Sequence, residues 1–163
     1  MVAYDPAQWH AFFTGTIGAA AALTGLLFVA ISINLDQILK FPQLPGRAAG
    51  TLGVLLASLV VSGFALVPGQ GDHALGIEIL ASGLAVATQS LWITFRRGSV
   101  DEPWPLVVAH LMTLLPPGLG YAIGGVSLVA GAGGGLYWVL AATLLVFVVS
   151  SVNAWVLLVE IKR

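Results

Sequence analysis

Charged side chains are scarce in this sequence. Only 8% of its 163 residues are charged and 58% are hydrophobic, whereas an ordinary soluble domain is about 25% charged. The six basic and seven acidic residues are too few to cover a water-exposed surface, and so hydrophobic a composition excludes a disordered chain. Their near-balance also lacks the basic footprint of a nucleic-acid-binding protein. We therefore expect the lipid bilayer, and no nucleic acid, to surround or contact this chain.

Cysteine is absent, which excludes disulfides, thiolate zinc sites and thiol catalysis. No serine has a histidine and a carboxylate at the same expected depth, and no phosphate-binding glycine loop follows a strand. The glycine-rich run 131–135 is interpreted as a turn outside the membrane. We predict that the protein is not an enzyme and that it has no cofactor and no metal site.

Long apolar runs dominate the sequence instead. Five of them reach the roughly 20 residues that are needed to cross about 30 Å of hydrocarbon. Because irregular backbone is not tolerated in contact with lipid, each run is predicted to be a helix. The runs are approximately Phe12–Leu35, Ala48–Val67, Ala74–Phe95, Pro105–Val129 and Leu136–Val159. The expected fold is an all-α membrane protein, with residues 1–163 forming one five-span domain.

The basic residues predict the orientation of these helices. All six lie in alternate segments, so five alternating spans bring them to one side: Lys40, Arg47, Arg96, Arg97, Lys162 and Arg163. Under the positive-inside rule this places the N-terminus outside and the C-terminus in the cytoplasm. The first residues lack a basic region typical of a signal peptide. Asp5, Pro6 and Gln8 instead have the pattern of a capped helix start.

Small residues recur every three or four positions in the first span, at Gly15, Gly18, Ala22 and Gly25. The third span repeats the pattern at heptad spacing, with Gly76, Gly83 and Ser90. Small side chains let helix backbones approach closely in a bilayer. We interpret both patterns as helix-packing seams, which join helices either within the chain or between copies in a homo-oligomer.

Glu78 is the only carboxylate well inside a predicted span, about 7 Å from its outer end at 1.5 Å per residue. Ser82 and Gln89 follow it on the same helix face. One interpretation is a station for an ion or proton, because intramembrane ionisable groups often mark pathways. The other is a carboxylate that reaches the outer interface or is held by neighbouring hydroxyl groups.

His110 lies one to two turns into the fourth span from the cytoplasmic side. We interpret it first as a structural hydrogen-bonding group and second as a transport or sensing residue. Gln89, Ser150 and Asn153 are expected at a similar depth, where they could join it in one polar layer. Glu78 and His110 are expected roughly 15 Å apart, too far for a salt bridge.

Two consecutive prolines, Pro116 and Pro117, interrupt the middle of the fourth span. Each removes a backbone donor and clashes with the preceding turn, so a kink or break is predicted there. A broken helix at this depth could line a ligand or ion site, and Tyr121 would place its hydroxyl beside the opening.

The first span, Trp9 to Leu35, and the last, Gly134 to Trp155, together resemble a family of small, largely uncharacterised actinobacterial multi-span membrane proteins. Members are sometimes labelled as modulators of the FtsH protease. The resemblance implies a multi-pass protein of the bacterial inner membrane and implies no site residues.

Two hypotheses about function follow from these features. The first is a non-enzymatic scaffold or regulatory subunit that binds other helices through its small-residue seams, in a homo-oligomer or with a partner membrane protein. The alternative is an oligomeric ion or proton channel or transporter that uses Glu78, Gln89 and His110. Tyr121 and Asn153 are further candidates for lining such a path.

Overall fold

The computed structural model describes residues 2–41, 43–97 and 104–159. These residues form five long helices, each long and apolar enough to cross a membrane. The long helices are α1 (His10–Ile33), α3 (Gln43–Ala65), α4 (Asp72–Arg97), α5 (Trp104–Ala130) and α6 (Leu136–Leu158). The short elements are the 3-10 turns η1 (Val2–Tyr4) and η2 (Pro6–Trp9) and the single-turn α2 (Leu35–Ile38). For these residues, the predictions of an all-helical fold and of five helices able to cross a membrane are confirmed.

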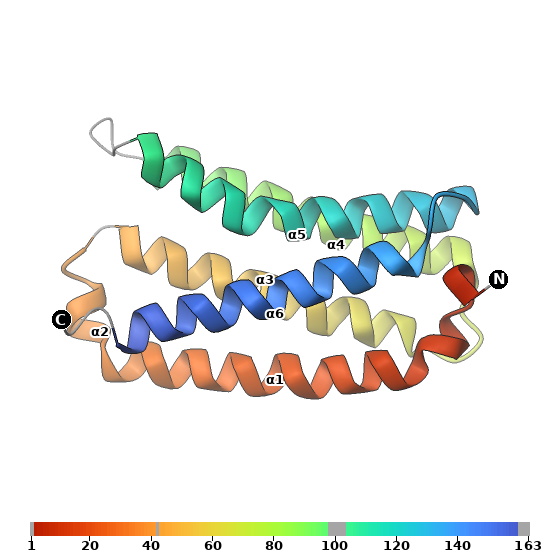
Figure 1. Cartoon of the computed structure of the whole chain (residues 1–163), viewed down its shortest axis with the longest axis horizontal. Coiled ribbons are helices and arrows are strands. Elements are labelled where there is room, and N and C mark those ends of the chain that lie inside the picture. The colour runs from red at the N-terminus through yellow and green to blue at the C-terminus, as the bar shows by residue number, and fades with distance from the viewer. Residues whose placement is uncertain (1, 42, 98–103, 160–163) are drawn as a thin grey trace.

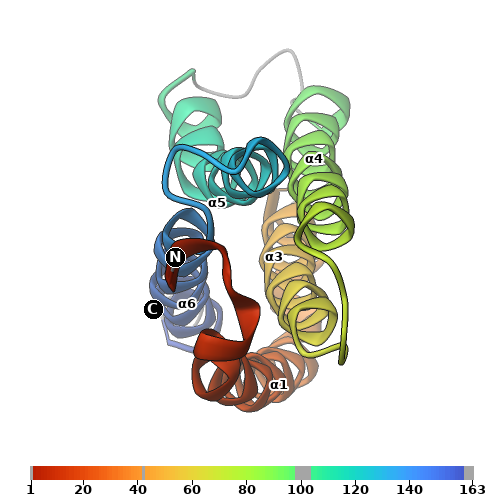
Figure 2. The same cartoon turned by 90° about the vertical axis from the view of Figure 1, so that its right-hand side faces the viewer.

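The five long helices alternate in direction and lie side by side as one bundle (Figure 1). Viewed along the bundle, they follow one another around it in the order α1, α3, α4, α5, α6 (Figure 2). The most extensive contact joins α4 to α5, and α3 also packs directly against α6. α1 lies at one edge of the bundle, where its neighbours are α3 and α6.

The expected cap at the N-terminal end is present. The Asp5 carboxylate accepts hydrogen bonds from the Ala7 backbone N–H at 3.1 Å and from the Gln8 side chain at 2.8 Å. Pro6 occupies the first position of η2, where its missing N–H leaves no hydrogen bond unmade. Asn34 separates α1 from α2, and its buried side-chain amide donates to the Leu157 carbonyl on α6 at 2.8 Å. Asn34 thus fixes the end of α1 against the end of α6.

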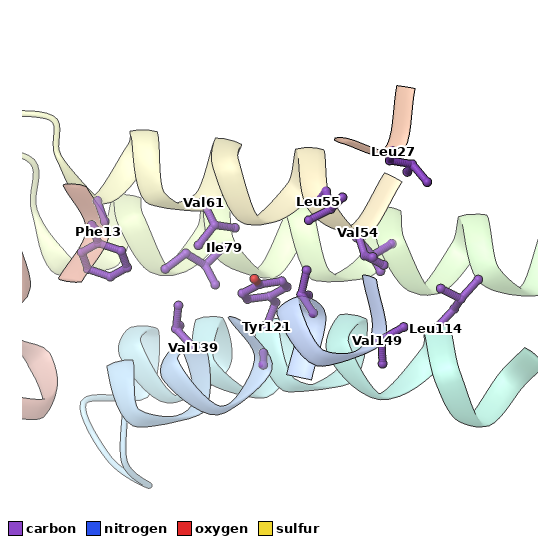
Figure 3. Close-up of a cluster of buried hydrophobic side chains, with 14 of the residues drawn as sticks. Phe13, Leu27, Val54, Leu55, Val61, Ile79, Leu114, Tyr121, Val139 and Val149 are labelled. Carbon is purple, nitrogen blue, oxygen red and sulfur yellow. The ribbon is translucent and has the colours of Figure 1, made fainter. Parts of the chain in front are cut away.

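Apolar side chains from all five helices fill the middle of the bundle (Figure 3). Tyr121 is the largest fully buried side chain and lies near the centre of this cluster. Towards the end of the bundle that holds the N-terminus, the core includes Phe13, Val61, Ile79 and Val139, each at most 1% exposed. We call these four buried side chains the apolar layer.

The close contact between α4 and α5 depends on glycines of both helices. A methyl group placed on Gly125 would lie 2.6 Å from the Gly76 carbonyl oxygen, and one on Gly83 would lie 2.4 Å from the Ala122 nitrogen. Real Cβ atoms do not come this close to backbone atoms. The heptad pattern of the third span is therefore a packing seam within the chain. The helix that covers it, α5, continues as one α-helix through Pro116 and Pro117.

Candidate functional site

The small residues of α1 lie on its outward face. Gly15, Gly18, Ala22 and Gly25 are all exposed. A methyl group placed on any of the three glycines would meet no atom within 4 Å. α1 contacts its neighbours with another face, whose buried residues are Phe13, Thr16, Ala20, Leu27 and Ala30. The predicted seam of the first span is thus unused by the described part of the chain, and we call its four residues the α1 glycine face.

The α1 glycine face continues into bulkier side chains further along the helix. Val29 follows Gly25 after four residues and Ile33 follows Val29 by the same step, and these two are 52% and 59% exposed. The step of three or four residues keeps all these positions on one side of the helix. α1 is also the least buried of the five spans. Its open side is mainly apolar, with the hydroxyl groups of Thr14 and Ser32 towards its two ends, and it is shallow where the glycines lie.

A second candidate site is a polar seam between α3 and α6. The Arg47 Nε donates to the Asn153 side-chain oxygen at 2.9 Å, and the Asn153 amide nitrogen donates to the Thr51 hydroxyl at 2.8 Å. Thr51 in turn donates to the Arg47 carbonyl oxygen at 2.8 Å. Thr51 and Asn153 are fully buried, and Arg47 is half-buried. The predicted candidate Asn153 therefore holds the basic end of α3 against α6.

A separate buried polar contact lies near the centre of the bundle, at Tyr121. Its hydroxyl lies 3.1 Å from the Thr143 hydroxyl on α6, and Ser58 on α3 lies beside the same phenol. One turn further along α3, Ser62 donates to the Ser58 carbonyl oxygen at 2.8 Å. Tyr121 thus points into the core between α3 and α6, where it bonds to a neighbouring helix.

Two buried polar atoms along this part of the bundle have no hydrogen-bond partner among the described residues. They are the hydroxyl oxygen of Ser150 and the side-chain oxygen of Asn34. Ser150 lies one turn before Asn153, on the same face of α6. The seam therefore has hydrogen-bonding capacity that its own side chains do not use. Beyond Tyr121 the apolar layer of Phe13, Val61, Ile79 and Val139 follows (Figure 3).

Glu78 lies apart from the polar seam, on α4. Its carboxylate accepts a hydrogen bond from the side-chain amide of Gln70, in the loop between α3 and α4. Ser82 donates to the Glu78 carbonyl oxygen at 2.8 Å rather than to its carboxylate. The carboxylate is half-buried and held locally. The sequence does not predict Gln70 as its partner, because a loop residue carries no helical periodicity that would place it beside Glu78.

Gln89 and His110 are predicted to share a polar layer with Asn153. The Gln89 side-chain amide donates to the Ala49 carbonyl oxygen at 3.3 Å. The same side chain packs against Gly53, where a methyl group would be 2.0 Å from the Gln89 side-chain oxygen. Gln89 from α4 and Asn153 from α6 therefore bind neighbouring turns of α3. The side chain of His110 lies outside the described residues, so its part in this layer and its separation from Glu78 stay predictions.

The C-terminal end of α5 and the N-terminal end of α6 are tied to the start of the chain. The Gly134 backbone N–H donates to the Tyr4 hydroxyl at 2.9 Å, and that of Gly135 donates to Ser127 at 2.7 Å. The Trp9 indole N–H donates to the Val2 carbonyl oxygen at 2.7 Å. The loop that the sequence suggests is a simple turn is thus covered by η1 and fixed by side chains.

Among the described residues, no group of three His, Asp or Glu side chains could hold a metal ion. No protein-family model, curated protein sequence or solved structure matches the chain.

Proposed function

We propose that this protein is a membrane scaffold or regulatory subunit that binds another transmembrane helix on the α1 glycine face. The observation that carries the proposal is that this face is open: a methyl group added to Gly15, Gly18 or Gly25 would have no atom within 4 Å, although all three lie in a span. Glycine lowers helix propensity by about 1 kcal/mol relative to alanine, so three glycines in one helix need a compensating role.

The contact between α4 and α5 shows how two helices pack when a glycine-rich face of one is covered by the other. There Gly76 and Gly83 bring two backbones into direct contact. Helices in a bilayer associate through close packing of this kind, because lipid chains are as apolar as the helices themselves. The α1 glycine face has the same residue types at helical spacing and lies on the outside of the bundle.

The occupant that we propose is the same face of a second copy, which makes the protein a homo-oligomer. A two-fold contact brings a surface patch against itself, and a shallow strip of glycine and alanine is complementary to its own copy. A partner membrane protein with a similar strip is the other occupant that the face would accept.

We further propose the orientation and shape that the sequence predicts. The position of all six basic residues on one side of five alternating spans supports an outside N-terminus and a cytoplasmic C-terminus. Pro116 and Pro117 inside α5 favour a bend above about 20°, since prolines are the usual cause of sharp kinks. The resemblance of the first and last spans supports the bacterial inner membrane as the location.

The alternative, an ion or proton path through Glu78, Gln89 and His110, has less support. Glu78 is bonded to Gln70 and Gln89 to Ala49, so each has a local partner. The unpartnered hydroxyl group of Ser150 favours a polar path, but buried apolar side chains, among them Phe13, Val61, Ile79 and Val139, fill the rest of the bundle. Proton flux into liposomes that Glu78→Gln abolishes would favour this alternative over the scaffold.

The absence of cysteine allows a direct test of the α1 contact. Ala22→Cys places a single thiol on the α1 glycine face, and Ala85→Cys places one at an exposed alanine of α4 as the matched control. Under mild oxidation in liposomes, we expect a disulfide-linked dimer for Ala22→Cys and much less for Ala85→Cys. Equal crosslinking of the two variants would contradict the proposal.

A further inference from the structure

Arg47 carries a positive charge at the end of the α3–α6 seam. It lies within a membrane-spanning helix, four residues after Gln43, so it is about 6 Å from the start of α3 at 1.5 Å per residue. Its side chain is half-buried, and the hydrogen bond described for it goes to the neutral amide oxygen of Asn153. This bond orients the guanidinium group without balancing its charge.

The orientation leaves the guanidinium group able to bind an anion. Arginine presents a planar fork of several N–H donors, and Asn153 accepts from the Nε atom. Thr51 accepts from the Asn153 amide and donates to the Arg47 carbonyl oxygen, so neither of these hydrogen bonds uses the guanidinium group. The terminal nitrogens of the guanidinium fork match the paired oxygens of a phosphate group.

A second observation indicates that this end of the seam has spare donors. Ser150 is 1% exposed, lies one turn from Asn153 on the same face of α6, and its hydroxyl has no partner among the described residues. A buried hydroxyl without a partner is costly, so such a group indicates a ligand or a bound water. Ser150 therefore leaves one unused donor a turn away from Asn153, the residue that orients Arg47.

We propose that the Arg47 end of the α3–α6 seam binds the phosphate group of an anionic phospholipid. Arg47 contacts the phosphate, while Asn153 and Thr51 act as positioning residues for its guanidinium group. Arg47 lies one turn inside the end of α3, from where a long arginine side chain can reach the membrane interface. Basic groups between membrane helices are known to hold anionic head groups at this interface.

The test measures which lipids stay bound to the full chain. The protein is extracted from vesicles of equimolar phosphatidylglycerol and phosphatidylcholine, and the retained lipids are counted by native mass spectrometry. A single arginine near the surface corresponds to about 1 kcal/mol, so we expect about a fivefold preference for phosphatidylglycerol. Arg47→Gln should remove this preference. Lys40→Gln, which changes an exposed cation near the same end, should keep it.

A second variant decides the question even if Arg47→Gln fails to fold. Asn153→Asp places a carboxylate where the guanidinium group already has its partner, so the chain supplies its own counterion. We expect a folded protein that has lost the lipid preference. Wild-type preference in folded Asn153→Asp or Arg47→Gln would overturn the proposal, as would equal retention of the two lipids by the wild type.

Inorganic phosphate distinguishes a lipid site from a general phosphate site. Added at millimolar concentration, it should leave the bound phosphatidylglycerol in place, because the acyl chains anchor the head group. Displacement of the lipid by inorganic phosphate would overturn the assignment to a lipid.

Discussion

Gly83 of α4 and Gly118 of α5 lie in direct backbone contact: a methyl group on Gly83 would be 2.7 Å from the Gly118 carbonyl oxygen. The same seven-residue step leads along α4 to Gly76 and along α5 to Gly125, which form the next contact of this kind. The two helices therefore meet through matched heptads of glycine. The α1 glycine face has comparable residues and no such partner within the described chain.

This difference predicts opposite results for one substitution at two places. Gly83→Ala should destabilise the protein by about 1–3 kcal/mol, because its methyl group would overlap backbone atoms that cannot move aside. Gly63→Ala, where a methyl group meets no atom, should be neutral or slightly stabilising, since alanine has the higher helix propensity. Denaturant unfolding in detergent micelles compares the two. Equal stability of both variants would show that α4 and α5 are not in contact.

A second prediction concerns the hydroxyl pair at the centre of the bundle. Tyr121→Phe keeps the buried ring and removes its hydrogen bond to Thr143, which should lower the free energy of unfolding by about 1 kcal/mol. Tyr137→Phe is the control, because Tyr137 is 52% exposed. In a double-mutant cycle, Tyr121→Phe and Thr143→Val should show an energetic coupling. Strict additivity would contradict the pairing.

A third prediction tests the fixed loop between α5 and α6. Gly135 has φ +51° and ψ −121°, and a methyl group there would lie 2.2 Å from the Ala3 carbonyl oxygen. Gly135→Ala should therefore displace η1, and proteolysis at the N-terminal end should become faster. Gly71→Ala, in a loop with open space around the glycine, should leave the cleavage rate unchanged. Equal cleavage rates of the two variants and the wild type would contradict the contact.

The sequence predicts the helices better than the contacts between them. Span length and the Asp5 cap follow from local rules, and the structure confirms them. The sequence does not predict whether Gly18 faces another helix of the chain or the lipid. Small residues at helical spacing form the same pattern in both cases. What separates α4 from α1 is the matching heptad, Gly118 and Gly125, on the partner helix.

The candidate site shows the same limit. Asn153 is identifiable in the sequence as a polar residue within a span, but its partner Arg47 is 106 positions away in the chain. The sequence also predicts that Arg47 lies in the loop before the second span. This prediction is wrong, because α3 begins at Gln43 and includes Arg47. Two polar residues on different spans meet only if the order of helices around the bundle makes those spans neighbours. The residue pattern within a single span does not reveal that order.

The central claim, that the α1 glycine face binds a second copy, is tested most directly by energy transfer between labelled proteins in liposomes. The wild type should associate, and Gly18→Leu should weaken the association at least about tenfold, equivalent to roughly 1.4 kcal/mol. Gly63→Leu adds the same side chain to a helical glycine of α3 that also has open space around it, and it should associate like the wild type. Energy transfer that is the same for all three proteins, or absent from the wild type at every protein-to-lipid ratio, would contradict the account.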